Sequence, residues 1–588
     1  MSTCVRRLLC ACLLAATLAA GQAPDSDVVL RALGDEVMRT LELSLPGLDK
    51  PYYSEFGLHD VDSFSVSAVL GGVLWQRRNR VRIPSIQVRV GSYEFDNTNY
   101  LLSDLGFGTM DVGRPSLENS YPALRHFFWL AADAAYKSSL QALARKRAAL
   151  RNVTVAEQTP DFWRADPVRV RLEAPRTPID AAAWTKVVAH LSSLFAGFPD
   201  LTRSGVHLEI VQSDYYFVNT EGTACRIPER LAQLRLSGAA LASDGMTVRD
   251  ATVFLAREPD GLPPLSELER AVRDLGERVQ ELARAPWGEP YLGPVLFEGA
   301  AAAQLFAEVL GRNLVARRRP VGEPGRPVPF QASEFEGRIG SRVLPEWMEV
   351  VDDPTQKEWR GRPLLGFYPV DLEGQVPKPV VLIERGVLRN LLLTRQPVAG
   401  FSASNGRARL PGAFGAKTAW FGNLFVRATE TVPAAELRQR LLAQCRARNL
   451  PYGLLVRKMD YPSSASAEEA RRLLTRLAQA GDGGRAISLP LLVYRLYPDG
   501  REELVRGLRF RAFSARTLRD ILAASEEVFL FEYLENGAPF ALSGAGSFVA
   551  ESAVVAPSVL FEELQLERAE EQLPNPPVVP PPSLSLRR

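Results

Sequence analysis

The sequence has 588 residues, in which 70 Lys and Arg residues nearly balance 68 Asp and Glu residues, so the formal net charge is +2. A hydrophobic content of 46% and a charged content of 23% are typical of a globular protein and exclude a wholly disordered chain. Because phosphate binding requires a concentrated basic face, the balanced charge argues against a nucleic-acid-binding protein.

The first residues have the three-part pattern of a secretory signal peptide. Arg6 and Arg7 precede an apolar run from Leu8 to Ala20, and the small residues at 19–21 offer a cleavage site. No later stretch reaches the ~18 apolar residues that a membrane helix needs. We therefore expect residues 1–23 to be removed and the mature chain to be exported, to the periplasm or beyond the cell, without a membrane span. An uncleaved N-terminal anchor is the alternative.

Residues 24–286 are predicted to form an N-terminal domain of mixed α and β structure. Apolar spacing predicts helices and alternation predicts strands; the helices fall at 26–46, 121–151, 181–194 and 265–285, and the strands at 65–70, 80–90, 168–172, 206–211 and 215–222. We interpret the basic string Trp75–Arg80 as a solvated loop and the last, charged helix as a connector. Pro286 and Pro290 mark the domain boundary.

Residues 287–570 are predicted to form a β-rich C-terminal domain, in which short apolar strands alternate with Gly-rich turns. Helices are expected near 300–314 and 433–448. The tail at 571–588 is rich in proline, and we expect it to be unpacked. Together the two domains predict an α+β fold.

Histidine and cysteine are scarce. The four histidines all precede the boundary and show no metal-ligand spacing, so we interpret each as a surface or satisfied core residue; they are His59, His126, His190 and His207. Since the second domain has no imidazole, it cannot build a Ser-His-Asp or Cys-His site alone. Beyond the signal peptide only Cys225 and Cys445 remain, and we favour burial of both as small apolar residues. Whether they pair stays open.

Segments of the second domain occur in an order that resembles the TldD/PmbA family of peptidase-related proteins. They are Gly293–Leu296, Leu305–Arg312, Val350–Thr355, Asp371–Gly374, Leu382–Leu388, Ser404–Arg407, Gly422–Val426, Asp499–Leu508 and Ala556–Leu560. Each segment is weak alone, and the shared order makes the match specific. The first domain resembles the family only loosely, through 219–222 and 243–245.

The resemblance implies that a metal site has been lost. In the family's catalytic subunits, a His-Glu-x-x-x-His stretch and a downstream Cys bind zinc. Here Ala307 and Arg312 stand at the two histidine positions, Glu308 is kept, and the Cys position falls near Ser543. A methyl group cannot ligate a metal and a guanidinium would repel one. The resemblance therefore implies no metal and no cofactor in this chain, with zinc held by a partner.

The pattern is that of the family's PmbA/TldE-like subunits. It implies pairing with a homologous zinc-bearing TldD-like subunit, or a homo-oligomer, and binding of flexible peptides as extended strands. Substrate-cleft positions implied by the resemblance are Ser404, Asn405, Arg407 and Asn423. Whether the chain is an enzyme stays open, although the missing ligands argue against it. One alternative, motivated by the retained Glu308, is an active metallopeptidase with an altered site that could use histidines of the first domain. The other is an envelope binding or scaffold protein without proteolysis.

Two groups of acidic residues permit a second interpretation. Asp352, Asp353, Asp371 and Glu373 could form a calcium or magnesium cluster. We favour turn residues instead, because Asp-Asp-Pro and Glu-Gly are common in turns. We also interpret Glu308 as a helix-surface carboxylate that pairs with Arg312 at i+4.

Overall fold

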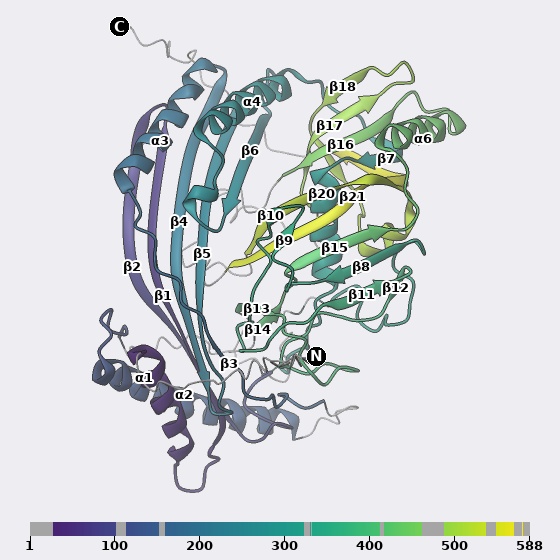
Figure 1. Cartoon of the computed structure of the whole chain (residues 1–588). Coiled ribbons are helices and arrows are strands. Elements are labelled where there is room, and N and C mark those ends of the chain that lie inside the picture. Colours follow the sequence, from purple (N-terminus) through teal and green to yellow (C-terminus); the bar gives the residue numbers. More distant parts are fainter. Residues whose placement is uncertain are drawn as a thin grey trace, which may run out of the picture.

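The computed structural model describes residues 27–100, 113–151, 159–322, 330, 332–411, 417–460, 487–536, 549–569 and 579. They form two parts side by side, each built on one large sheet (Figure 1). Helices and strands both contribute, so the α+β prediction is confirmed. The predicted signal peptide, Ser543 and nearly all of the predicted proline-rich tail lie outside the described residues.

The first part is a six-stranded sheet with the strand order β2-β1-β4-β5-β3, and β6 also pairs with β5. The elements in chain order are α1 (Val28–Arg39), β1 (Pro51–Val69), β2 (Gly72–Val90), α2 (Tyr121–Leu150), β3 (Arg169–Arg171), α3 (Ala181–Ser193), β4 (Leu201–Asn219), β5 (Ala224–Leu241), β6 (Thr247–Ala256) and α4 (Leu265–Arg284).

One face of this sheet is covered by helices. Along β4, Val206, Leu208 and Ile210 pack with α3 and α4, while Tyr216 and Val218 pack with α1 and α2. All five positions are even-numbered, so they lie on one face, because successive side chains of a strand alternate. The odd-numbered positions therefore face the second part (Figure 1).

The second part is an eleven-stranded mixed sheet with the order β12-β11-β8-β15-β21-β7-β16-β17-β18, in which β19 and β20 also pair with β21. Its strands are β7 (Tyr291–Phe297), β8 (Met348–Asp352), β11 (Val380–Glu384), β12 (Val387–Leu388), β15 (Asn423–Ala428), β16 (Gly453–Met459), β17 (Pro490–Leu496), β18 (Glu502–Val505), β19 (Leu508–Phe510), β20 (Ile521–Asn536) and β21 (Val549–Arg568). Two small ladders pair β9 (Glu358–Trp359) with β10 (Arg362–Pro363), and β13 (Ala408–Pro411) with β14 (Lys417–Ala419).

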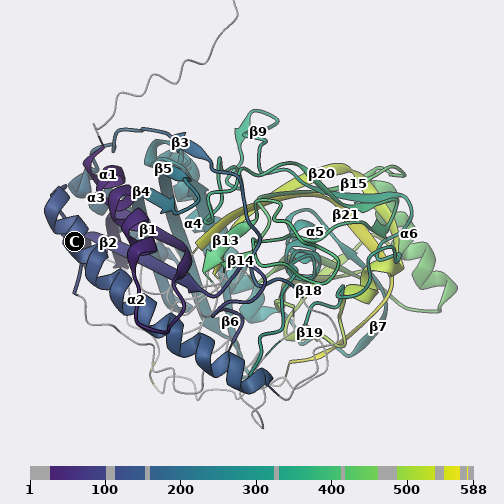
Figure 2. The same cartoon turned by 90° about the horizontal axis from the view of Figure 1, so that it is seen from below.

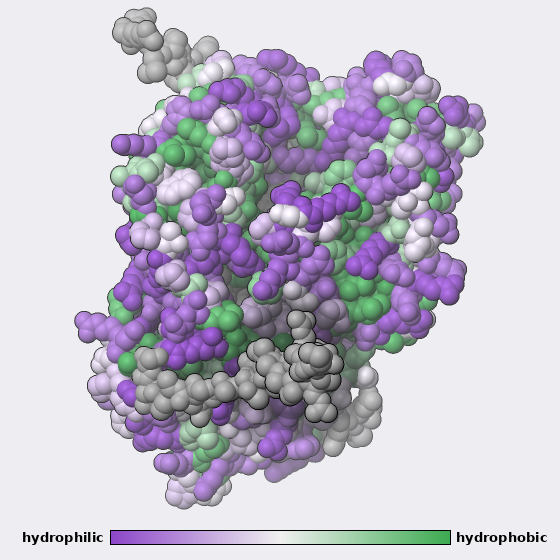
Figure 3. All heavy atoms as spheres, viewed as in Figure 1, coloured by the Kyte–Doolittle hydropathy of each residue, from purple (hydrophilic) through white to green (hydrophobic). Residues whose placement is uncertain are grey.

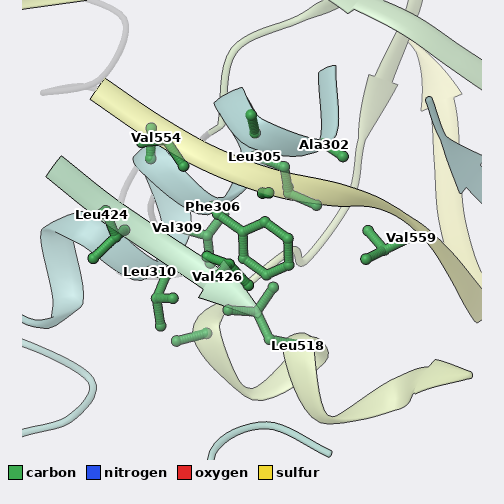
Figure 4. Close-up of a cluster of buried hydrophobic side chains, with 14 of the residues drawn as sticks. Ala302, Leu305, Phe306, Val309, Leu310, Leu424, Val426, Leu518, Val554 and Val559 are labelled. Atoms are coloured by element: carbon green, nitrogen blue, oxygen red, sulfur yellow. The ribbon is translucent and has the colours of Figure 1, made fainter. Parts of the chain in front are cut away.

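A buried helix lies inside the curve of the second sheet (Figure 2). It begins as α5 (Ala300–Leu305) and continues as a π-helical turn, η4 (Phe306–Gly311), whereas α6 (Ala434–Ala447) lies outside (Figure 1). Every residue from 301 to 311 is buried, and all of them except Gln304 and Glu308 are apolar or glycine, as expected for a helix inside a core. Phe306 packs among Leu424, Val426 and Leu518 (Figure 4).

Several sequence predictions need correction. Trp75–Arg80 is not a loop but lies in the exposed first half of β2, which is an edge strand. The helix at 265–284 is not a free connector, because its apolar stripe packs on β5 and β6. The segments at 206–211 and 215–222 are largely one strand, β4. Cys225 and Cys445 are both buried and free, as the burial interpretation predicts.

None of the helices in the described residues is both long and apolar enough to cross a membrane.

Candidate functional site

The π-helical turn carries the three positions at which the sequence resembles a zinc motif. Ala307 is 1% exposed and packs in the apolar core of the second part. The Glu308 carboxylate accepts hydrogen bonds from Gln304 Nε2 at 2.8 Å and from the backbone N–H of Ser488 at 2.7 Å. Glu308 is only 8% exposed, so its interpretation as a surface carboxylate is wrong, because the helix lies inside the sheet. The Arg312 cation interacts electrostatically with Glu308, and the predicted i+4 pair stays a prediction.

The residues at this turn do not fit a zinc ion. Zinc in proteins is held by imidazole, thiolate or carboxylate donors. Ala307 offers a methyl group, and both oxygens of Glu308 are engaged. Arg312 brings a permanent cation, and the carboxylates of Glu535 and Glu308 help to keep its pKa above the ordinary value against the effect of burial. No group of three His, Cys, Asp or Glu residues in the described ranges is arranged to hold a metal.

A pocket of about 360 Å³ lies beside this helix, between the two parts of the molecule. Ala300, Ala301 and Gln304 of α5 form one wall. The other walls come from residues 251–255 of β6 and 530–532 of β20. Gln304 links the pocket to the motif, because its side-chain amide donates both to Glu308 and to the carbonyl oxygen of Asp460. We call this space the edge pocket.

β6 presents an open edge to the edge pocket. Among the described residues it pairs only with β5, without a register shift. Neither backbone group of Ala251 points to β5: its N–H donates to Asp250 Oδ1, and its carbonyl oxygen accepts from Lys458 Nζ at 2.7 Å. Since hydrogen-bonding direction alternates along an antiparallel strand, Val253 and Leu255 also direct their N–H and C=O groups outward.

β20 presents a second edge to the same pocket. Its only strand partner among the described residues is β21, on which Glu532 lies opposite Ala553. The N–H of Ala553 donates to Gly422 and therefore points away from β20. Glu532 and, two residues earlier, Leu530 must then direct their backbone groups away from β21. Two strand edges, one from each part, thus line one pocket.

Charged side chains fix the two parts around the edge pocket. Lys458 of β16 donates to the Ala251 carbonyl and forms an ion pair with Asp250, and burial lowers the pKa of this lysine. Arg249 of β6 pairs with Asp460 at 2.5 Å. These contacts hold β6 against β16 while the edge beyond Ala251 stays open. In the space-filling view the two halves are separated by a hollow (Figure 3).

Known proteins match both the second part and the whole fold. A family model described as "PmbA/TldA metallopeptidase C-terminal domain" matches residues 291–461. Two curated relatives are both named "Metalloprotease". One, from Methanothermobacter thermautotrophicus, is 28% identical over 238 residues, which cover 39% of this chain and 47% of the relative. The other, from Archaeoglobus fulgidus, is 33% identical over 81 residues, which cover 14% of this chain and 18% of the relative. The matches thus span about half or less of these relatives.

Two solved structures share the fold at low identity. TldE from Thermococcus kodakarensis has a TM-score of 0.52 at 12% identity, over 88% of this chain and 97% of that chain. A putative modulator of a DNA gyrase from Thermotoga maritima also has a TM-score of 0.52, at 14% identity, over 87% and 96%. Over residues 291–461 the chain is related to the TldD/PmbA family. These residues lie within the second part of the structure.

The four cleft positions implied by TldD/PmbA resemblance hold loops together in this structure. Asn405 accepts from the Leu393 N–H and donates to the Leu391 carbonyl, and Ser404 donates to the Leu393 carbonyl. Arg407 is fully buried and pairs with Asp352 at 2.5 Å. Asn423 donates to two backbone carbonyls, those of Asp353 and Gln356. None of the four lines the edge pocket, and their contact with substrate stays a prediction.

Asp353 and Asp371 behave as the turn interpretation predicts, whereas Asp352 is the last residue of β8 and forms a buried ion pair. Asp371 accepts three backbone N–H groups, from Glu373, Gln375 and Ala408. Asp353 accepts from the Thr355 N–H, and Asp352 pairs with Arg407 as described above. These carboxylates therefore stabilise the loops of the second part.

The four histidines contact different residues. His59 stacks on Tyr215 and lies 3.3 Å from Glu229, whereas His190 lies 2.7 Å from Glu269. His207 tilts against Trp75, and burial lowers the pKa of His207 to about 4. His126 lies next to Trp129. No two of them share a partner, so they do not converge on one site.

The sequence analysis predicted neither of the two pocket edges, β6 and β20, and it also missed β5, the strand beside β6. β5 and β6 were not predicted, although β5 alternates clearly: Ile227, Ala232, Leu234 and Leu236 are buried, with less buried neighbours between them. That alternation was the available signal for a strand at 224–241. No sequence signal places β6 opposite β20, because the two strands are far apart in the chain and meet only through tertiary packing.

Proposed function

We propose that this chain is a non-catalytic member of the TldD/PmbA family that binds flexible peptides as extended strands in the edge pocket. The observation that carries the proposal is the pair of open strand edges, β6 and β20, facing one pocket. An extended peptide gains affinity from main-chain hydrogen bonds to such an edge. Because these bonds do not involve side chains, the affinity depends little on the sequence of the peptide. The bonds would form at Val253 and Leu255 on one side and at Leu530 and Glu532 on the other.

The proposal gives the chain no hydrolytic step of its own. Glu308 is the one motif residue that could act as a base, and its carboxylate already accepts from Gln304 and from the Ser488 N–H. The two bonds hold the carboxylate against protein groups, and Ala307 and Arg312 beside it supply no metal donor that could hold a water molecule for it to activate. An altered active site built on Glu308 is therefore disfavoured.

Cleavage would belong to a partner. We propose that a homologous zinc-bearing TldD-like subunit completes the peptide cavity, with a homo-oligomer as the other assembly to be tested. The N-terminal sequence pattern further supports export of the mature chain, in which case the partner is exported too.

The test uses the mature chain, residues 24–588, and a fluorescent unstructured peptide whose binding is followed by anisotropy. Val253→Pro removes the outward N–H of β6 without breaking the ladder to β5, because proline is tolerated at such an edge position. Loss of one hydrogen bond at ~0.5–1.5 kcal/mol predicts binding that is about 2- to 10-fold weaker.

Val253→Ala is the matched control, since it trims the side chain and keeps the N–H. We expect it to bind the peptide like the parent chain. Equal affinity of the Val253→Pro variant and the parent, in a variant whose circular dichroism is unchanged, would refute strand addition at β6. Cleavage of the peptide by the parent chain alone would refute the non-catalytic role.

A further inference from the structure

A second cavity, of about 270 Å³, lies between the first sheet and the second part. β4 and β5 form one wall, mainly with odd-numbered residues on the sheet face that the helices leave uncovered. The loop at 367–372, together with Arg409 and Glu551, forms the other wall. None of its lining residues lines the edge pocket, so the two are separate spaces.

The walls of this cavity are mostly apolar. The apolar side chains include Leu172, Val211, Ile227, Leu231, Phe367 and Val370. Sites for drug-sized ligands usually measure ~300–1,000 Å³, so this cavity suits something smaller, of the size of one amino acid.

Arg409 supplies a cation with hydrogen-bonding capacity to spare. Its guanidinium lies 4.0 Å from the centre of the Tyr368 ring and donates to the Glu551 carbonyl oxygen at 3.0 Å. It forms no ion pair with any carboxylate of the described residues. A guanidinium has five N–H donors in a fork that matches a carboxylate, so most of its donors remain for a ligand.

Glu229 supplies an anion in the same cavity. Its ion-pair partner among the described residues is His59, at a long 3.3 Å, and 36% of its side chain is exposed. Burial raises the pKa of Glu229, but His59 and Arg409 more than offset this and hold the pKa below its ordinary value. The group is therefore ionised and reachable from solvent.

The other charged groups of the cavity are already engaged. Arg230 donates to three backbone carbonyl oxygens. Arg257 donates to two more and pairs with Glu551 at 3.2 Å. Asp371 accepts three backbone N–H groups. One cation and one anion, set in an apolar wall, remain for a ligand.

We propose that this cavity binds a single zwitterionic α-amino acid with an apolar side chain. The Arg409 guanidinium donates to the ligand's carboxylate, the Glu229 carboxylate accepts from its ammonium group, and the apolar wall buries its side chain. A simple anion satisfies only Arg409, and a simple amine only Glu229. The proposal does not rest on peptide binding in the edge pocket.

The experiment is isothermal titration of the mature chain with L-phenylalanine, N-acetyl-L-phenylalanine and L-phenylalaninamide. We expect the free amino acid to bind at millimolar or lower concentration, and each derivative, which lacks one of the two charges, to bind at least tenfold more weakly. No heat of binding with L-phenylalanine would overturn the proposal. Equal affinity for the acetylated derivative would also overturn it, because a carboxylate alone would then suffice.

Variants assign the binding to this cavity. Arg409→Gln and Glu229→Gln should each weaken L-phenylalanine binding at least tenfold, and Arg446→Gln, on the exposed side of α6, should leave it unchanged. Binding that persists in both cavity variants would place the ligand elsewhere and contradict the proposal. Should a variant fail to fold, the three ligands tested on the parent chain still decide the question.

Discussion

Gly311 lies where the buried helix of the second part touches Phe421. A Cβ atom at Gly311 would lie 2.3 Å from Phe421 Cε1, far inside van der Waals contact. Gly311 is one of the positions that match the family's zinc-helix stretch, and here its contact with Phe421 gives it a packing role. The contact with Phe421 therefore gives Gly311 a role in close packing that requires no metal.

The packing role of Gly311 predicts a specific loss of stability. Gly311→Ala overfills the core and should lower the free energy of unfolding by ~1–3 kcal/mol, measured by urea denaturation. Gly34→Ala in α1 is the matched control, because a Cβ there meets nothing within 4 Å; it should raise the free energy of unfolding by ~0.4–1 kcal/mol. Equal free energies of unfolding for the two variants would contradict the packing role, because the Phe421 ring would then move aside without cost.

At the scale of elements, the sequence predicted helices better than strands. The apolar stripes of α2 and α4 were recognised because each has one buried face. The strands were predicted too short, since the half of β4 from 210 to 219 is buried on both faces and therefore loses its alternation. That Ala307 and Arg312 carry no metal-donor side chain follows directly from the sequence. It could not predict the edge pocket, which depends on how β6 and β20 meet in space.

At the scale of the whole molecule, Arg395 joins the two parts. Its fully buried guanidinium donates to the Trp163 carbonyl and to Glu221, both of the first part, at 2.8 Å. Its backbone N–H donates to Glu373 at 2.7 Å. Burial, and then the neighbouring Asp371 carboxylate, raise the pKa of Glu373 to about 8. We therefore expect the Glu373–Arg395 contact, which lies beside the junction of the two parts, to respond to pH.

The raised pKa of Glu373 sets the direction of this sensitivity. Because the folded state binds the proton more tightly than the unfolded state does, the free energy of unfolding falls as pH rises from about 4.5 towards about 8. Glu373→Gln removes this titration, so the stability of the variant relative to the parent should increase over that range by ~1–3 kcal/mol. Denaturation at several pH values measures it.

Glu384→Gln serves as the control, since Glu384 is 53% exposed and its ion-pair partner among the described residues is the exposed Arg389. Its stability relative to the parent should change little with pH. If the difference in free energy of unfolding between Glu373→Gln and the parent were the same at every pH, Glu373 would not be the group that binds the proton.

The most direct test of the account is hydrogen–deuterium exchange of the mature chain with and without a saturating unstructured peptide. The account predicts slower exchange in two segments that are distant in sequence, 251–256 of β6 and 528–534 of β20, because both edges gain a hydrogen-bonded neighbour. Bound peptide with unchanged exchange in both segments would show that it docks elsewhere and would contradict the central claim.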